Sequence, residues 1–158
     1  MATDNNPIPI NIDWTCLPFN ELTGKDVYDM LYLRNLVFVM EQDCLYLDTD
    51  HKDFHAWHLL GRHEGNVVAY ARLIPAGISY NELSIGRVVC APEVRRTGVG
   101  RRLMAQAIDE MQRIYGYGAI RISAQCYLEQ FYRDFGFESE GETYLEDGLP
   151  HVEMCRIS

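Results

Sequence analysis

The sequence predicts an α+β protein, or a mixed sheet with helices on its faces. Segments that resemble strands outnumber those that resemble helices, and three strand segments follow one another closely. The helical segments are too few and too irregularly placed for a doubly wound parallel sheet. The 158 residues fit a single domain spanning 1–158, in which residues 1–9 are expected to be flexible because they show little pattern and contain two prolines.

The first half of the chain opens with a strand and a helix. Residues 10–17 alternate apolar and polar side chains, as a half-buried strand does. Residues 22–39 carry apolar side chains at helical spacing, after a threonine that can cap the first turn. Residues 41–55 lose this periodicity and contain five acidic residues, which predicts a loop. The runs 56–61 and 67–74 then predict two strands joined by the turn RHEGN.

The second half alternates strands and helices before a final pair of strands. Residues 83–91 end in an apolar run, which is typical of a strand buried on both faces. Residues 99–115 place apolar side chains three and four positions apart, which predicts an amphipathic helix. Residues 119–124 predict a strand, and residues 128–135 predict a short helix that ends at a glycine. ETYLEDG and PHVEMCRI predict two last strands around the turn DGLP.

Composition restricts the partners of this chain. The formal net charge is -9 and the pI is about 4.9, which argues against nucleic acid or an anionic membrane as the main partner. A cationic ligand fits this charge better. The five cysteines form no CxxC pair, and no signal peptide or long apolar run is present. These features predict a cytoplasmic protein with reduced thiols.

The short basic stretch RRTGVG (95–100) has the parts of a phosphate site. The start of the following helix offers free backbone N–H groups and a positive charge of roughly half a unit. Gly98 and Gly100 have no Cβ atom, so an anion can approach the backbone closely. This sequence does not fit a Walker A loop, because its glycines are not followed by lysine and then serine or threonine. It does not fit a dinucleotide fingerprint either, because Leu103 stands where that motif has its third glycine. A solvated basic helix start is the alternative.

The pattern Arg95-x-x-Gly98-x-Gly100 after an apolar strand resembles the acyl-CoA-binding motif of the GNAT N-acetyltransferase superfamily. VVCAP (88–92) is similar to that family's fourth strand, and FYRDFGF (131–137) is similar to its late helix. The segments that resemble the bacterial ElaA-like branch are 33–48, 69–73, 85–95 and 144–154.

The resemblance covers nearly the whole chain from about residue 13 onward, and it implies a fold. That fold is the GNAT fold, a mixed and mostly antiparallel sheet of about six or seven strands flanked by about four helices. In this family the sheet is splayed between the fourth and fifth strands. We therefore expect an α+β protein with a cleft between these two strands.

The resemblance also implies acetyl-CoA as the co-substrate, with no metal. The pyrophosphate would lie on the amides from Arg96 through Arg101, and one strand amide, at Val89 or Cys90, would point at the thioester oxygen. Many family members carry an asparagine shortly after the fifth strand, where this chain has Gln125. The implied cofactor-binding residues are Val88, Val89, Cys90, Arg95, Arg96, Thr97, Gly98, Val99, Gly100, Arg101 and Gln125.

Tyr132 stands where the family keeps a tyrosine, which implies that it protonates the leaving thiolate. The usual pKa of tyrosine, about 10, is close enough to that of a thiol, about 8.5, for such a transfer. Packing beside Phe131 and Phe135 is the alternative role. The implied reaction is direct attack of a primary amine on acetyl-CoA through a tetrahedral intermediate, without an acyl-enzyme.

An attacking amine must be neutral, so a base or a chain of waters is needed. Glu41, on the loop after the first helix, is the best candidate, and His58 or His151 could also carry the proton. We expect Asp48 and His151 to bind the acceptor. The acids that could attract a cationic amine are Asp48, Asp50 and Glu153, and a solvated loop is the alternative for the loop acids.

Two other functions fit parts of the sequence. A non-catalytic acyl-CoA sensor would keep the RRTGVG turn and would not need Tyr132. A metal site would draw on the histidines and aspartates of residues 48–58, but their spacing matches no compact motif. Whether the acceptor is a small molecule or a protein amine is open, and the family's frequent pairing through late strands leaves room for a homodimer. The residues of the metal alternative are His51, His55, His58, Asp48, Asp50 and Asp53.

Overall fold

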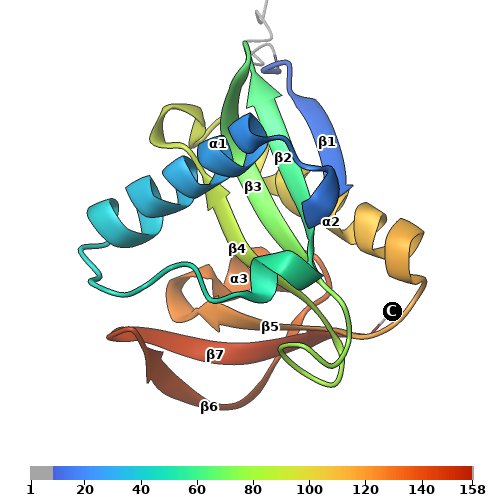
Figure 1. The fold of residues 1–158 in the computed structure, drawn as a ribbon. Helices are drawn as coiled ribbons and strands as arrows, with labels where there is room; N and C mark the ends of the chain where they lie inside the picture. The colour runs from blue at the N-terminus through green and yellow to red at the C-terminus, as the bar shows by residue number, and fades with distance from the viewer. Residues whose placement is uncertain (1–8, 158) are drawn as a thin grey trace, which may run out of the picture.

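The computed structural model describes residues 9–157, which contain one seven-stranded sheet (Figure 1). The strand order is β1-β2-β3-β4-β5-β7-β6, and only β4 and β5 run parallel. The expected α+β architecture with a mostly antiparallel sheet is confirmed. Residues 1–9 were expected to be flexible, but residues 1–8 lie outside the described part of the chain. The strands are β1 (Asp13–Pro18), β2 (Trp57–His63), β3 (Asn66–Ile74), β4 (Leu83–Cys90), β5 (Ile120–Gln125), β6 (Glu138–Glu146) and β7 (Leu149–Arg156).

Helices cover both faces of this sheet. α1 (Gly24–Arg34) crosses one face and α2 (Val99–Tyr115) lies on the other, whereas the short α3 (Glu129–Arg133) follows β5 (Figure 1). Residues 9–157 thus hold three α-helices and several short helical turns, where about four helices were expected. The predicted apolar stripe of α2 is confirmed, because its buried residues are Val99, Leu103, Met104, Ala107, Ile108 and Met111.

The threonine cap predicted for α1 is present as a capping box, and the helix changes its winding before it ends. The Thr23 side chain accepts from the Asp26 amide at 3.1 Å, and the Asp26 carboxylate accepts from the Thr23 amide at 2.9 Å. Beyond Arg34 the backbone continues as π-helical turns (Asn35–Glu41). Wider turns of this kind often occur at functional sites, and here they bring Phe38 to the cleft of the sheet.

The final hairpin differs from the prediction in length and register. β6 begins at Glu138, four residues before the predicted start, and β7 begins at Leu149. The turn is therefore the two-residue Asp147–Gly148, not the four-residue DGLP. Its φ angles of 50° and 78° are those of a primed hairpin turn, which asparagine or aspartate followed by glycine favours. β1 likewise covers 13–18, where 10–17 was predicted.

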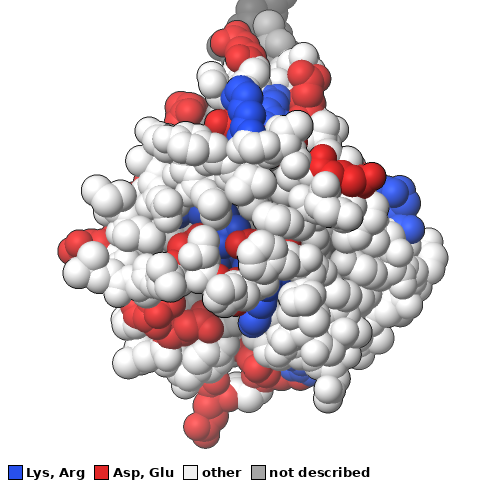
Figure 2. Space-filling model, viewed as in Figure 1, with Lys and Arg blue, Asp and Glu red and all other residues white. Residues whose placement is uncertain are grey.

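The acidic loop that follows α1 folds onto buried arginines. The guanidinium of Arg34 has no exposed surface and contacts Asp48 at 2.7 Å and Asp53 at 2.8 Å. Arg72 on β3 contacts Asp50 at 2.7 Å and Asp53 at 3.1 Å. Basic and acidic side chains lie together in the hollow at the middle of the face shown in Figure 2. The loop is thus held to α1 and β3 by ion pairs.

These pairs revise the expectation that Asp48 and Asp50 attract a cationic amine. Arg87 on β4 contacts Asp48 at 2.9 Å, so both carboxylate oxygens of Asp48 lie on arginines. Burial alone would raise the pKa of Asp50, but hydrogen bonds and charge from Arg72, with charge from Arg87, lower it to about 2. Both carboxylates are therefore already paired with arginines, and they balance protein cations.

Replacing Arg34 with Met is expected to lower the free energy of unfolding by roughly 3–5 kcal/mol, because each of the buried carboxylates of Asp48 and Asp53 loses one of its two arginine partners. Chemical denaturation monitored by circular dichroism measures this loss. The matched control is Arg62→Met, which breaks a more exposed pair with Asp26 and should cost about 1 kcal/mol or less. Equal losses in the two variants would contradict a stabilising role for the buried cluster.

Candidate functional site

β4 and β5 separate after a short parallel contact, which opens a cleft in the sheet. Only Leu83–Ile120 and Ser84–Arg121 are paired between these strands. The expected splay between the fourth and fifth strands is therefore confirmed. β4 also carries a bulge, where Arg87 has a φ of 50° and the pairing with β3 shifts register. Beyond the bulge, the edge of β4 that faces the cleft has no partner strand among residues 9–157.

The direction of the β4 amides decides which of them faces the cleft. The Ala91 amide donates to the Val68 carbonyl on β3 at 2.8 Å, and N–H directions alternate along a strand. The amide of Cys90 therefore points away from β3, toward the cleft, whereas that of Val89 points to β3. The Cys90 carbonyl agrees, since it accepts from Arg95 on the far side of the strand at 3.4 Å. Of the two predicted amides, only Cys90 has the required direction.

One cavity, which we call the turn-side cavity, runs along this free edge of β4 toward the start of α2. Six of the predicted cofactor-binding residues line it. They are Val88, Val89, Cys90, Arg95, Gly100 and Gln125. Glu41, Gln42, Phe38 and Tyr132 also line the turn-side cavity. An apolar strand, a glycine and an arginine thus meet in one elongated space.

The remaining predicted cofactor residues form the turn before α2 or its first residues. Gly98 is the N-cap residue and has a φ of 85°, a conformation that glycine adopts without strain. Val99 is buried in the core, and the Thr97 hydroxyl donates to the Val94 carbonyl, so these two side chains stabilise the turn. Arg101 pairs with Asp134 at 2.9 Å. Arg96 also has a positive φ, of 63°, and is exposed.

Glu41 lies at this turn and is already paired. Its carboxylate contacts the Arg95 guanidinium at 2.6 Å. The side chain of Glu41 is 41% exposed and that of Arg95 is 40% exposed. Glu41 lines the turn-side cavity but not the second cavity described below. The predicted base thus lies on the side of the cleft where the cofactor turn is, and its role as a base stays a prediction.

Tyr132 on α3 occupies the middle of the cleft. Its side chain is 7% exposed and packs edge-to-face against Phe131 at 5.2 Å and Phe137 at 6.0 Å between ring centroids. Burial raises the pKa of its phenol above the usual range, so the hydroxyl keeps its proton at neutral pH. A buried, protonated phenol can donate to an anion that forms next to it.

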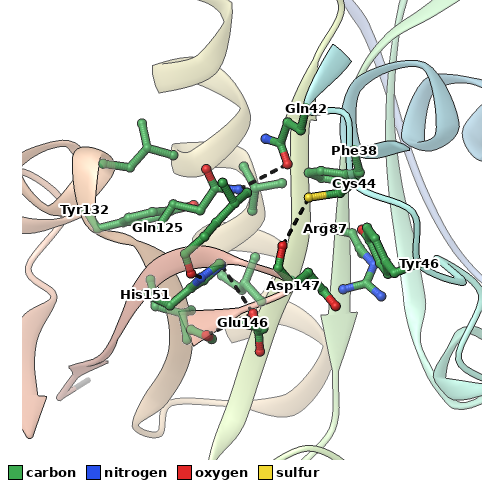
Figure 3. Close-up of a pocket in the computed structure, with 17 residues that line it drawn as sticks. Phe38, Gln42, Cys44, Tyr46, Arg87, Gln125, Tyr132, Glu146, Asp147 and His151 are labelled. Atoms are coloured by element: carbon green, nitrogen blue, oxygen red, sulfur yellow. Dashed lines mark hydrogen bonds and ion pairs between the residues drawn. The ribbon is translucent and has the colours of Figure 1, made fainter. Parts of the chain in front are cut away.

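A second cavity, which we call the hairpin-side cavity, lies on the other side of Tyr132 (Figure 3). The loop after α1, the bulge of β4 and the β6–β7 hairpin enclose it. Its polar lining consists of Gln42, Cys44, Tyr46, Arg87, Ser123, Gln125, Glu146, Asp147 and His151. The Cys44 thiol donates to the Asp147 carbonyl at 3.2 Å and connects the loop to the hairpin turn across this space.

The two cavities meet around Tyr132. The residues that line both are Phe38, Gln42, Val88, Gln125, Leu128 and Tyr132. Gln125, which was predicted only for the cofactor, thus faces both cavities. It also donates to the Gln42 side chain at 3.5 Å (Figure 3). A long molecule in the turn-side cavity and a second molecule in the hairpin-side cavity would therefore touch beside Tyr132.

The predicted histidines take different places. His151 lines the hairpin-side cavity, and its role in binding the acceptor stays a prediction. His58 is fully buried, and its two ring nitrogens bond to the Tyr70 hydroxyl at 2.7 Å and the Asp53 carbonyl at 2.8 Å. Burial lowers the pKa of His58, which keeps it neutral and structural. Glu153 lies away from both cavities and contacts Arg121 at 3.5 Å.

Sequence reasoning missed Glu146, Ser123 and Gln42. Glu146 stands one residue before the Asp147–Gly148 turn, and its place over the cleft depends on how β6 pairs with β7. The Asp-Gly pair was the available signal, because it marks a tight hairpin turn. The five cysteines, all within the described residues, are free thiols. No helix in residues 9–157 is long and apolar enough to cross a membrane.

Comparison with known proteins agrees with this geometry. The sequence model of the acetyltransferase (GNAT) domain matches residues 33–157. A UPF0039 protein of Synechocystis is 42% identical over 146 residues, which cover 92% of this chain and 95% of that protein. Protein ElaA of Escherichia coli is 36% identical over 147 residues, which cover 92% of this chain and 96% of ElaA.

Solved structures show the same arrangement. An acyl-CoA N-acyltransferase from Pseudomonas aeruginosa superposes with a TM-score of 0.87 at 38% identity, covering 91% of this chain and 99% of that one. Escherichia coli ElaA gives a TM-score of 0.87 at 36% identity, with 92% and 99% covered. N-acetylglutamate synthase from Neisseria gonorrhoeae, solved with coenzyme A and N-acetyl-glutamate, shares only the fold, with a TM-score of 0.64 at 18% identity over 92% of this chain and 35% of that chain.

Proposed function

Because this chain belongs to the GNAT acetyltransferase family and is an acyltransferase, we propose that it moves an acetyl group from acetyl-CoA to a primary amine. The observation that carries the proposal is that two cavities meet at one buried tyrosine. The turn-side cavity suits acetyl-CoA, and the hairpin-side cavity suits the amine. The amine attacks the thioester directly, through a tetrahedral intermediate.

The residues along the turn-side cavity fit acetyl-CoA. The free amide of Cys90 can donate to the thioester oxygen, and the unpaired edge of β4 can bond to the amide groups of pantetheine. Gly98 and Gly100 leave the first amides of α2 open to a pyrophosphate, since a Cβ on Gly98 would contact nothing within 4 Å and one on Gly100 only a sulfur at 3.9 Å. The coenzyme A in the synthase of the same fold supports this choice.

Tyr132 acts as the acid in this proposal. Attack by the amine expels a thiolate, and the protonated phenol of Tyr132 at the junction of the cavities can return a proton to it. Cys90 is a poor nucleophile in comparison, because burial raises the pKa of its thiol to about 11 and leaves little thiolate at neutral pH. Direct transfer without an acyl-cysteine follows.

A non-catalytic acyl-CoA sensor, the alternative that the sequence left open, would need only the turn-side cavity. The hairpin-side cavity has a polar lining and reaches Tyr132. A sensor would not need this second cavity, so its presence favours an enzyme over a sensor. We further propose that the protein works in the cytoplasm, where its five free thiols stay reduced, and that its acceptor is a small molecule or a protein amine. A homodimer stays a prediction.

The test is an acetyl-CoA turnover screen over a panel of polyamines, aryl amines, amine-containing antibiotics and lysine peptides. Free thiol release is the readout. We expect at least one amine to raise thiol release well above the rate with acetyl-CoA alone. Acetyl-CoA binding without any amine-dependent release across the panel would instead support the sensor.

A further inference from the structure

His151 and Glu146 form a pair at the hairpin-side cavity that the sequence prediction did not connect. His151 Nε2 lies 3.2 Å from Glu146 Oε2, and His151 Nδ1 lies 2.7 Å from the Leu149 carbonyl oxygen (Figure 3). The histidine side chain is 9% exposed, whereas that of Glu146 is 50% exposed. One partner thus faces the cavity and the other reaches solvent.

The hydrogen bonds determine where the protons on this pair can be. A carbonyl oxygen only accepts, so Nδ1 of His151 must carry a hydrogen to bond to Leu149. In the neutral ring, Nε2 then has a lone pair that faces the Glu146 carboxylate. A proton between Nε2 and Oε2 would turn this contact into a charge-assisted hydrogen bond. The geometry therefore favours uptake of one proton at Nε2.

The neighbours of the pair hold Glu146 in place. The Ser123 hydroxyl donates to Glu146 Oε2 at 3.3 Å, and Ser123 in turn bonds to the Tyr144 hydroxyl. The Tyr144 ring stacks on His151, with 6.1 Å between ring centroids. Three strands, β5, β6 and β7, thus hold both members of the pair. The exposed side of Glu146 gives a proton a path to water.

The charges around the cavity favour a cation. The ionisable groups near the pair on the surrounding elements are Cys44, Tyr46, Tyr80, Arg87, Tyr132, Tyr144 and Asp147. Arg87 is the only cation among these residues, and Asp48 at 2.9 Å balances its charge. Glu146 and Asp147 leave the cavity negative. An ammonium group is therefore attracted to it.

We propose that the His151–Glu146 pair is the proton acceptor for an acceptor amine that enters as an ammonium ion. This inference rests on the proposed acetyl transfer. The ammonium gives one proton to the pair, which holds it between Glu146 Oε2 and His151 Nε2, and the free amine attacks the thioester carbon. The C–S bond breaks, the thiolate takes the proton of Tyr132, and the phenolate recovers a proton from the new amide nitrogen. The proton on His151 leaves to solvent beside Glu146, so one proton is released per turnover.

Glu41 is less suited to this role than the pair. Its carboxylate contacts Arg95 at 2.6 Å and is therefore already engaged in an ion pair. It also lines only the turn-side cavity. An amine in the hairpin-side cavity would approach His151 first. Glu41→Gln is thus the variant that separates the two assignments.

A nuclear magnetic resonance titration tests the pair without any substrate. We expect ¹⁵N shifts of His151, assigned with His151→Gln, to show the Nδ1–H form of the ring at high pH. The Nε2 resonance should move in Glu146→Gln, because the carboxylate 3.2 Å from it is removed. Glu142→Gln, which removes an exposed carboxylate from the same strand, should leave that resonance unchanged. An unmoved Nε2 resonance in Glu146→Gln, or an Nε2–H ring, would overturn the proposal.

Kinetics then test the role of the pair in transfer, with acetyl-CoA and whichever amine of the panel turns over fastest. His151→Gln should lower kcat by roughly 10²- to 10⁴-fold. Glu146→Gln should lower kcat as well, and by more than Glu41→Gln does. A kcat that falls in Glu41→Gln but stays unchanged in His151→Gln and Glu146→Gln would overturn the proposal. If no amine turns over with the unmodified protein, the acetyl-transfer function itself fails, which is a separate result.

Discussion

Replacing Tyr132 with Phe should lower kcat by roughly 10²- to 10⁴-fold while acetyl-CoA binding is kept. The change removes only the hydroxyl that would protonate the leaving thiolate. The ring contacts with Phe131 and Phe137 are retained, so the fold should be unaffected. Steady-state rates of thiol release, measured across pH with a reactive amine, give the size of the effect.

The control for this substitution is Tyr117→Phe, which removes a hydroxyl from a side chain that is 81% exposed and lines neither cavity. Its turnover should equal that of the unmodified protein. If Tyr132→Phe also keeps full turnover at every pH, Tyr132 is not the acid and serves only to pack α3 against its neighbours.

Replacing Gly100 with Glu should raise the Kd of acetyl-CoA by about 100-fold, which is about 2.7 kcal/mol. The new carboxylate would lie in the first turn of α2, where the pyrophosphate is proposed to bind, and would repel it. Isothermal titration calorimetry measures the change. Gly100 is a cleaner position than Gly98, because Gly98 has a positive φ and any side chain there would strain the turn.

Gly100→Ala is the matched control, since its Cβ would lie 3.9 Å from the Cys90 sulfur, an ordinary contact. We expect its affinity for acetyl-CoA to stay within a few-fold of the unmodified protein. Unchanged binding in Gly100→Glu would mean that the phosphates lie elsewhere and would remove the main support for the turn-side cavity as the cofactor site.

Much of the fold could be predicted from the sequence because its signals are local. The apolar stripe of α2 repeats at helical spacing, and Thr23 with Asp26 forms a capping box within four residues. The glycine turn before α2 can likewise be recognised from a few adjacent residues. These features need no knowledge of distant contacts, and the structure has them where they were predicted.

The acidic loop shows what local signals leave out. Read alone, Asp48 and Asp50 form a negative loop that could attract an amine. Their partners, Arg72 and Arg87, stand 22 to 39 residues further along the chain and reach them only through the pairing of β3 with β4. The balance of charge at this site therefore depends on tertiary structure.

The candidate acceptor site was harder to predict than the cofactor site for the same reason. Glu146 and Ser123 are 23 residues apart in the sequence. They come together because β7 pairs with β5 on one side and with β6 on the other. The bulge at Arg87, which turns the edge of β4 toward the cleft, has no clear sequence signal either. Strand order and register bring the hairpin-side cavity together, and neither can be read from one segment.

Transfer of a labelled acetyl group tests the central claim most directly. The protein would be mixed with ¹³C-acetyl-CoA and the most active amine of the panel, and the products examined by mass spectrometry. We predict one ¹³C-acetyl group on the amine for each thiol released, and none on the protein. Thiol release with unlabelled amine would reveal hydrolysis, and label on a cysteine would reveal an acyl-enzyme, so either result would contradict direct acetyl transfer.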